Sequence, residues 1–168
     1  MATRADAIAK AREHLHSGAF LGELGRRVGY RTESQNAGSG PALRAYLEEN
    51  LRPAFADLGF ATWMIESPTG KGPYLLANYH EDDALPTILT YGHGDVVDGM
   101  EGEWRDQLDP WQVTTKRDRA HGRGQAENKG QHTTHQAALR AGRGARRRRH
   151  APAAPAPTRD RRDRRRAA

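Results

Sequence analysis

The chain has 168 residues, a hydrophobic fraction of 36%, a formal net charge of +6 and no cysteine. This length suits one domain with a hydrophobic core, and without cysteine any metal must be bound by His, Asp or Glu. Residues 1–131 carry 15 Lys and Arg against 19 Asp and Glu, whereas residues 132–168 carry 12 Arg against 2 Asp. The N-terminus lacks the apolar core of a secretory signal, and no run approaches the roughly 18 apolar residues of a membrane span. We therefore expect a soluble, cytoplasmic protein.

Three helices are expected in the first third of the chain. Apolar residues at helical spacing predict a surface helix over residues 4–16 and a second helix from Ala19 to Gly29. Pro41 at a first turn and Gly59 beyond a last turn frame a third helix. The apolar stripe of that third helix consists of Leu43, Tyr46, Leu47 and Leu51.

Three strand-like runs follow, at residues 60–66, 73–79 and 86–93, and turn-forming residues separate them. Adjacent Ile88 and Leu89 in the third run predict a strand that is buried on both faces. Helices followed by strands and a further helix indicate an α/β layered domain.

The last part of the chain changes composition abruptly. Residues 111–124 predict two short strands around a charged turn, and a helix is expected from Asn128 to about Leu139. From His132 onward, Arg, Ala and Pro make up 25 of 37 residues. Such a segment buries too little apolar surface to offset its ordering entropy, so we predict a disordered tail over residues 132–168.

The stretch "YGHGDVVDGMEGEW" places His93 and Asp95 two positions apart at the end of the third run. On a strand, residues i and i+2 point to the same side, and open α/β sheets bind ligands at this end. A metal-bound histidine needs its second ring nitrogen fixed, commonly by a carboxylate. The alternative is an ordinary polar turn in which Asp95 caps a nearby helix.

A second candidate segment is "HGRGQAENKGQH", where glycines allow a close backbone approach and Glu127 lies just before a helix. A carboxylate there suits a metal ligand, with Lys129 balancing its charge. Alternatively, Glu127 serves only the electrostatics of the helix N-terminus. The segment is not a phosphate loop, because neither phosphate-binding glycine spacing is present.

Taken together, "TILTYGHGDVV", "DPWQV" and "GRGQAENKG" resemble, in order and spacing, the front half of the M20 family of zinc metallopeptidases and deacylases. The resemblance covers roughly residues 5–131 and includes the early "FLGELGRRVGYRTES". It implies the first part of a three-layer α/β/α zinc-hydrolase domain. It also implies hydrolysis of N-acyl amino acids or short peptides, and homodimers in some members.

The resemblance assigns roles to three residues. His93 would be a zinc ligand, Asp95 the catalytic-site residue that orients it, and Glu127 the carboxylate that bridges two zinc ions. The family has aspartate at this last position, and the extra methylene of glutamate alters the bridge. In the family, zinc activates a water that attacks an amide carbonyl, while a glutamate takes its proton.

The remaining ligands that the family supplies, a Glu-Glu pair among them, have no counterpart after Glu127, since only Asp160 and Asp163 follow. His132 and His135 are interpreted as exposed helix histidines. We therefore expect an inactive chain with exposed apolar faces, including Ile88, Leu89, Leu75 and Leu76, and poor solubility.

The Arg/Ala/Pro-rich string of the tail is typical of GC-rich coding DNA read in the wrong frame. A frameshifted or truncated gene product whose native-like part ends near residue 131 is the leading interpretation. The alternative is a fragment without catalytic activity whose arginine-rich tail binds nucleic acid or anionic surfaces. Nucleic acid is the less favoured partner, because the tail has no aromatic residues for base stacking.

Overall fold

The computed structural model describes residues 3–70 and 72–145. The chain begins with α1 (Arg4–His16) and α2 (Ala19–Val28), close to the ranges expected from the sequence. Thr3 caps α1 through a reciprocal pair of hydrogen bonds with Asp6, which satisfies two free amide groups of the first turn. Gly18, with a φ of 80°, makes the turn between the two helices.

The third predicted helix is one continuous rod with a π-helical centre. It consists of α3 (Gly40–Ala45), the π-helix η1 (Tyr46–Leu51) and α4 (Arg52–Ala56). Gly59 follows its end with a φ of 77°, as a glycine beyond a C-terminus does. The rod buries Tyr46 and Leu51.

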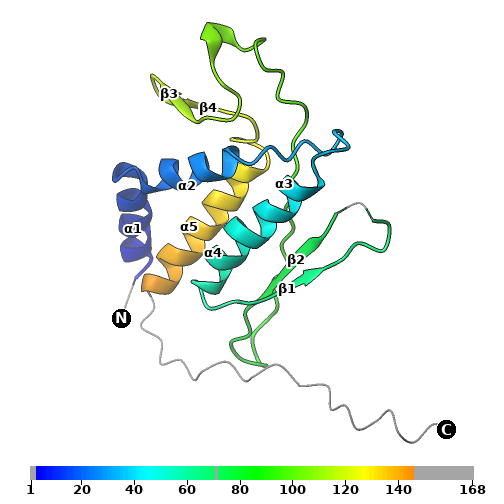
Figure 1. The fold of residues 1–168 in the computed structure, drawn as a ribbon. Helices are drawn as coiled ribbons and strands as arrows, with labels where there is room; N and C mark the ends of the chain where they lie inside the picture. The colour runs from blue at the N-terminus through cyan, green and yellow to red at the C-terminus, as the bar shows by residue number, and fades with distance from the viewer. Residues whose placement is uncertain (1–2, 71, 146–168) are drawn as a thin grey trace, which may run out of the picture.

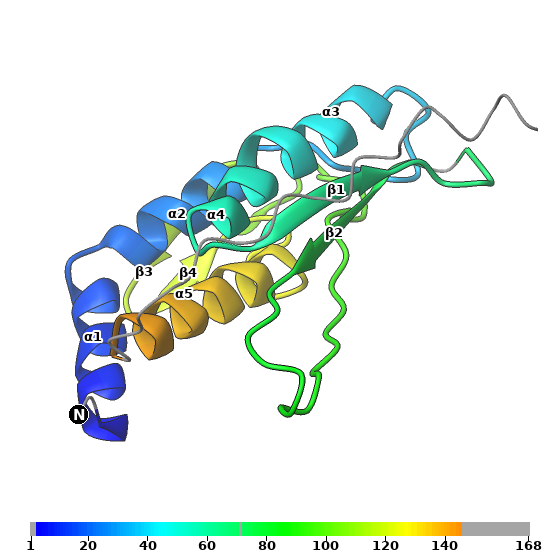
Figure 2. The same cartoon turned by 90° about the horizontal axis from the view of Figure 1, so that it is seen from below.

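The predicted runs at residues 60–66 and 73–79 are β1 (Ala61–Ile65) and β2 (Tyr74–Asn78), an antiparallel hairpin with Trp63 opposite Leu76. The α4 helix packs against both strands, and Figures 1 and 2 show the rod along one side of the hairpin. Side chains alternate between half-buried and exposed along both strands, so the hairpin has one covered and one open face.

The prediction of a buried strand at residues 86–93 is wrong in this structure. The segment is extended but pairs with no described strand, and Ile88, Leu89 and Tyr91 are 84%, 88% and 82% exposed. A parallel strand needs neighbours on both edges, and the described residues place none beside it. The expected exposure of apolar side chains is confirmed for Ile88, Leu89 and Leu76, whereas Leu75 is half-buried.

The two short strands expected within residues 111–124 are β3 (Thr114–Lys116) and β4 (Arg119–His121), which pair antiparallel. Between the hairpins, the 3₁₀ turn η2 (Arg105–Gln107) is the one short helix. The helix expected from Asn128 is α5 (Lys129–Ala145), which packs against α1 and α2 and lies beside the α3–α4 rod in Figure 1.

The α5 helix corrects the predicted tail over residues 132–145. Thr133 and Gln136 are fully buried, because Thr133 bonds back to the Lys129 carbonyl and Gln136 accepts a hydrogen bond from Arg27. Residues 146–168, the rest of the predicted disordered tail, lie outside the described residues. The division of the chain at residue 131 stays a prediction.

The core lies where α2, the rod and α5 meet. Its apolar members are Leu24, Val28, Tyr46, Leu51, Leu58, Val96, Trp111 and Ala141. None of the described helices is long and apolar enough to cross a membrane.

Candidate metal-binding site

His93 lies in an irregular segment that residues 31–34 hold in place. Thr32 donates from its hydroxyl to the Gly94 carbonyl at 2.6 Å, and the Val96 amide donates to the Thr32 carbonyl at 2.8 Å. An isolated parallel bridge joins Glu33 to Val96. His93 is therefore positioned by a local loop–loop contact, although the strand expected before it is unpaired.

The carboxylate of Asp95 fixes the ring of His93. The Nδ1 atom lies 3.0 Å from Asp95 Oδ1 and 3.2 Å from the Asp95 backbone oxygen. Nδ1 is therefore the nitrogen that carries the proton toward Asp95, which leaves Nε2 free to bind a ligand. The carboxylate is engaged with the ring of His93, as the metal-site interpretation expects, and not with a helix N-terminus.

Glu127 completes the pair from the loop before α5. Its Oε1 atom lies 2.7 Å from His93 Nε2, so two residues separated by 34 positions converge at one point. Burial lowers the pKa of His93, but the hydrogen bonds to Glu127 and Asp95 outweigh it, and the pKa lies above its usual value. Without a metal, the two carboxylates favour a protonated imidazole between them.

The geometry accommodates a zinc ion only in part. Tetrahedral zinc would hold a nitrogen and an oxygen ligand about 3.4 Å apart, farther than the present hydrogen bond. The Glu127 side chain is 68% exposed and free to move back by that amount. Catalytic zinc sites use three protein ligands. Within residues 3–70 and 72–145, the one cluster of three metal-ligating side chains includes neither His93 nor Glu127. The described residues thus supply two donors and not a complete centre.

That cluster consists of Glu33, Asp98 and Glu101. Glu33 accepts a hydrogen bond from the Gly99 amide at 2.9 Å, and Glu101 accepts one from Trp111 at 2.6 Å. These carboxylates have structural partners that hold the segment after Val96 against the core.

The interpretation of His132 as an exposed helix histidine is wrong, whereas His135 is exposed as expected. His132 is half-buried, and its Nδ1 atom lies 2.7 Å from the hydroxyl of the fully buried Tyr46. Burial, and then nearby positive charges, lower the pKa of His132 to about 4. The apolar stripe of the third helix already placed Tyr46 in the core, but its spacing carried no signal for the hydroxyl's partner.

Lys129 is fully buried below the same loop. Its ammonium donates to the Tyr30 carbonyl and lies 5.3 Å from the centre of the Tyr46 ring. Burial lowers the pKa of this amine to about 7. The prediction that Lys129 balances a metal-bound carboxylate is not tested, because its bonds run to the core.

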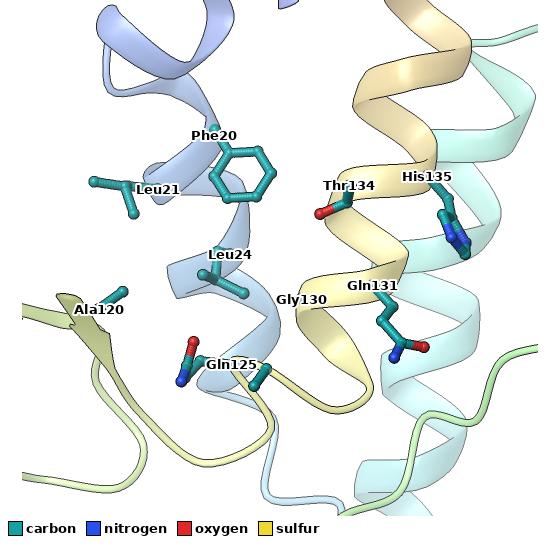
Figure 3. A pocket seen from close by; sticks show the side chains of 10 residues that line it. Phe20, Leu21, Leu24, Ala120, Gln125, Gly130, Gln131, Thr134 and His135 are labelled. Carbon is teal, nitrogen blue, oxygen red and sulfur yellow. The ribbon is translucent and has the colours of Figure 1, made fainter. Parts of the chain in front are cut away.

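A shallow hollow of about 350 Å³ opens between α2, β4 and α5. In Figure 3, Phe20, Leu21 and Leu24 line one side, and Gln131, Thr134 and His135 line the other. None of His93, Asp95 and Glu127 borders it.

Two curated relatives match part of the sequence. The chain is 38% identical over 82 residues to acetylornithine deacetylase of Vibrio campbellii, and equally to that of Vibrio parahaemolyticus. The match covers 49% of this chain and 20% of either relative, so the chain spans about a fifth of their length. No model of a protein family matches the chain.

Two solved structures share the fold. The dipeptidase Dug1p of Saccharomyces cerevisiae superposes with a TM-score of 0.73 at 18% identity, over 86% of this chain and 32% of that one. Human carnosine dipeptidase 1 superposes with a TM-score of 0.68 at 21% identity, over 82% of this chain and 31% of that one. The mixed helices and strands described above therefore form part of a larger α/β fold.

Proposed function

Because the chain belongs to the M20 family of metallopeptidases and deacylases, we propose that it carries part of the metal site of an amide-bond hydrolase. His93 and Glu127 are the metal ligands of this proposal, and Asp95 orients His93. By analogy with the deacetylases and dipeptidases that it resembles, the substrate class is N-acyl amino acids or short peptides.

One observation carries the proposal: the free ring nitrogen of His93 and the carboxylate of Glu127 meet at 2.7 Å. A hydrogen bond from Asp95 to the opposite ring nitrogen is the arrangement that metal-binding histidines use. Convergence of an oriented imidazole and an exposed carboxylate from distant segments favours a metal site over two unrelated turns.

The same geometry limits the chain's own activity. With two donors, the described residues bind zinc weakly and leave the reaction without the remaining ligands and a general base. Glu48 and Glu49, the one adjacent glutamate pair of the sequence, lie in η1. We expect no hydrolysis of N-acetyl amino acids or dipeptides by this chain with added zinc.

A zinc titration of the purified chain tests the proposal. Wild-type protein is expected to bind about one zinc ion weakly, because two protein donors leave the coordination incomplete. His93→Ala and Glu127→Ala should abolish binding, whereas His135→Ala, which removes an exposed histidine of α5, should not. No zinc binding by the wild-type chain would contradict the proposal, and two tightly bound ions would contradict the incomplete site.

Several earlier expectations stay predictions. These are a pair of zinc ions, cytoplasmic location and homodimerisation. The frameshifted tail is tested by sequencing the locus for an intact alternative frame that encodes a Glu-Glu strand. Binding of nucleic acid by the tail falls on residues outside the described ones, apart from the end of α5. It would require an affinity that falls steeply with salt.

A further inference from the structure

We propose that Tyr46 and His132 are positioning residues for His93. Their hydrogen-bonded side chains form a platform on which the His93 loop, residues 92–95, rests. The inference rests on the proposed function, since it concerns how a metal ligand is held. The role belongs to two side chains that lie outside the pair of metal donors.

The ring of Tyr46 supports the loop at Gly94. A Cβ atom at position 94 would lie 2.7 Å from both Cδ1 and Cε1 of Tyr46, closer than any real side chain approaches. The backbone after His93 therefore lies flat on the aromatic ring, and glycine is the residue that permits this contact. Tyr46 is fully buried and has little freedom to turn aside.

The ring of His132 supports the loop at Gly92. A Cβ atom at position 92 would lie 2.5 Å from Nε2 and 2.9 Å from Cδ2 of His132. Asn128 Oδ1 would lie 3.0 Å from the same point. The two glycines that flank His93 thus contact the two members of one hydrogen-bonded pair.

The pair itself is held from several sides. The hydroxyl of Tyr46 and Nδ1 of His132 are 2.7 Å apart, and the two rings stack with centroids 6.0 Å apart. Tyr30 packs edge-on against Tyr46 with its centroid at 5.7 Å, and the ammonium of Lys129 lies over the same ring. The platform is therefore rigid on the side of η1 and α5.

Thr32 holds the opposite side of the loop through its 2.6 Å hydrogen bond to the Gly94 carbonyl. The backbone around His93 is confined between this bond and the platform, and Asp95 fixes the ring. A ligand held in this way keeps its Nε2 atom in place, which is the condition for tight metal binding.

The first experiment compares glycine substitutions. Gly92→Ala inserts a methyl group into the contact with His132 and should weaken zinc binding about tenfold, in the range found for groups that orient metal ligands. Gly142→Ala in α5 is the matched control, because a Cβ atom there meets nothing within 4 Å. Chelator competition measures the affinity, and circular dichroism verifies that both variants are folded.

The second experiment removes the platform's own bond. Tyr46→Phe keeps the ring under Gly94 but loses the hydroxyl, so it should weaken zinc binding while the thermal midpoint stays near that of Gly142→Ala. His132→Ala should weaken it too, and adding Gly92→Ala to His132→Ala should cause no further loss, because the contact is already absent. Additive losses would show that the two residues act separately.

A readout without metal separates this inference from the proposed function. The ¹⁵N signals of the His93 ring report its tautomer and hydrogen bonds in the metal-free chain, and they should shift in Tyr46→Phe and Gly92→Ala but not in Gly142→Ala. Unchanged ring signals overturn the positioning role, as does unchanged zinc affinity in both variants. Absence of zinc binding by the wild-type chain overturns the proposed function, and the ring signals then decide the positioning role alone.

Discussion

Acidification from pH 7 to pH 4 is expected to destabilise the fold through His132. Burial, followed by the positive charges of Arg27 and His93, lowers the pKa of this imidazole to about 4. In the unfolded chain a histidine titrates at about 6.5. Because the folded pKa is the lower one, the stabilisation is fully present above pH 6.5 and is lost as the pH falls toward 4. The difference corresponds to roughly 3 kcal/mol of unfolding free energy at pH 4.

Urea unfolding followed by circular dichroism at pH 7 and pH 4 measures this loss. His132→Asn retains a polar partner for Tyr46 but has no titrating group, so it should lose roughly 3 kcal/mol less than the wild-type chain. His135→Asn, which changes an exposed histidine one turn further along α5, should behave like wild type. If the wild-type chain and His132→Asn lost stability in parallel, the buried imidazole would not be the cause.

Two further substitutions test the site and the surface. Glu127→Asp is expected to bind zinc about tenfold more tightly in a chelator competition, because the shorter side chain loses the 2.7 Å hydrogen bond to His93 that the ion must displace; weaker binding would contradict this. Ile88→Lys should reduce concentration-dependent light scattering without lowering the thermal midpoint, because the side chain is 84% exposed, whereas Leu24→Lys in the core should unfold the chain. A large loss of stability in Ile88→Lys would show that this side chain is buried in solution.

The sequence predicted best what depends on short-range pattern. The first helix has the predicted limits, and both the hairpin of β1 and β2 and the pair β3 and β4 occur where alternation and turn residues indicated them. Helical spacing and turn chemistry act over a few residues, so such features need no knowledge of distant partners.

The strand expected at residues 86–93 shows the limit of that reasoning. Its apolar run has the composition of a strand buried on both faces, but composition does not supply the neighbours that a parallel strand requires. The tail shows the opposite error, because a low apolar content over residues 132–145 gave no hint that α5 would bury Thr133 and Gln136 through hydrogen bonds. Polar burial depends on partners that the sequence alone does not reveal.

The candidate site divides along the same line. His93, Asp95 and Glu127 were found by motif, and the structure brings the three together, although their role as metal-site residues stays a proposal. Tyr46 and His132 escaped notice because they lie 86 positions apart and meet only in the fold. The signal available was indirect, in the two glycines that flank His93.

The positioning of the metal donors does not depend on the sheet. His93 is held by Thr32, by the bridge from Glu33 to Val96 and by the platform of Tyr46 and His132, all of which lie among helices and loops. The segment just before it is the most exposed apolar stretch of the described chain. Because hydrogen bonds and close glycine contacts fix the loop locally, the half-site keeps its geometry while the adjoining strand has no partner. Zinc binding and solubility should therefore respond to different substitutions, the first to changes under the His93 loop and the second to changes at residues 88–91.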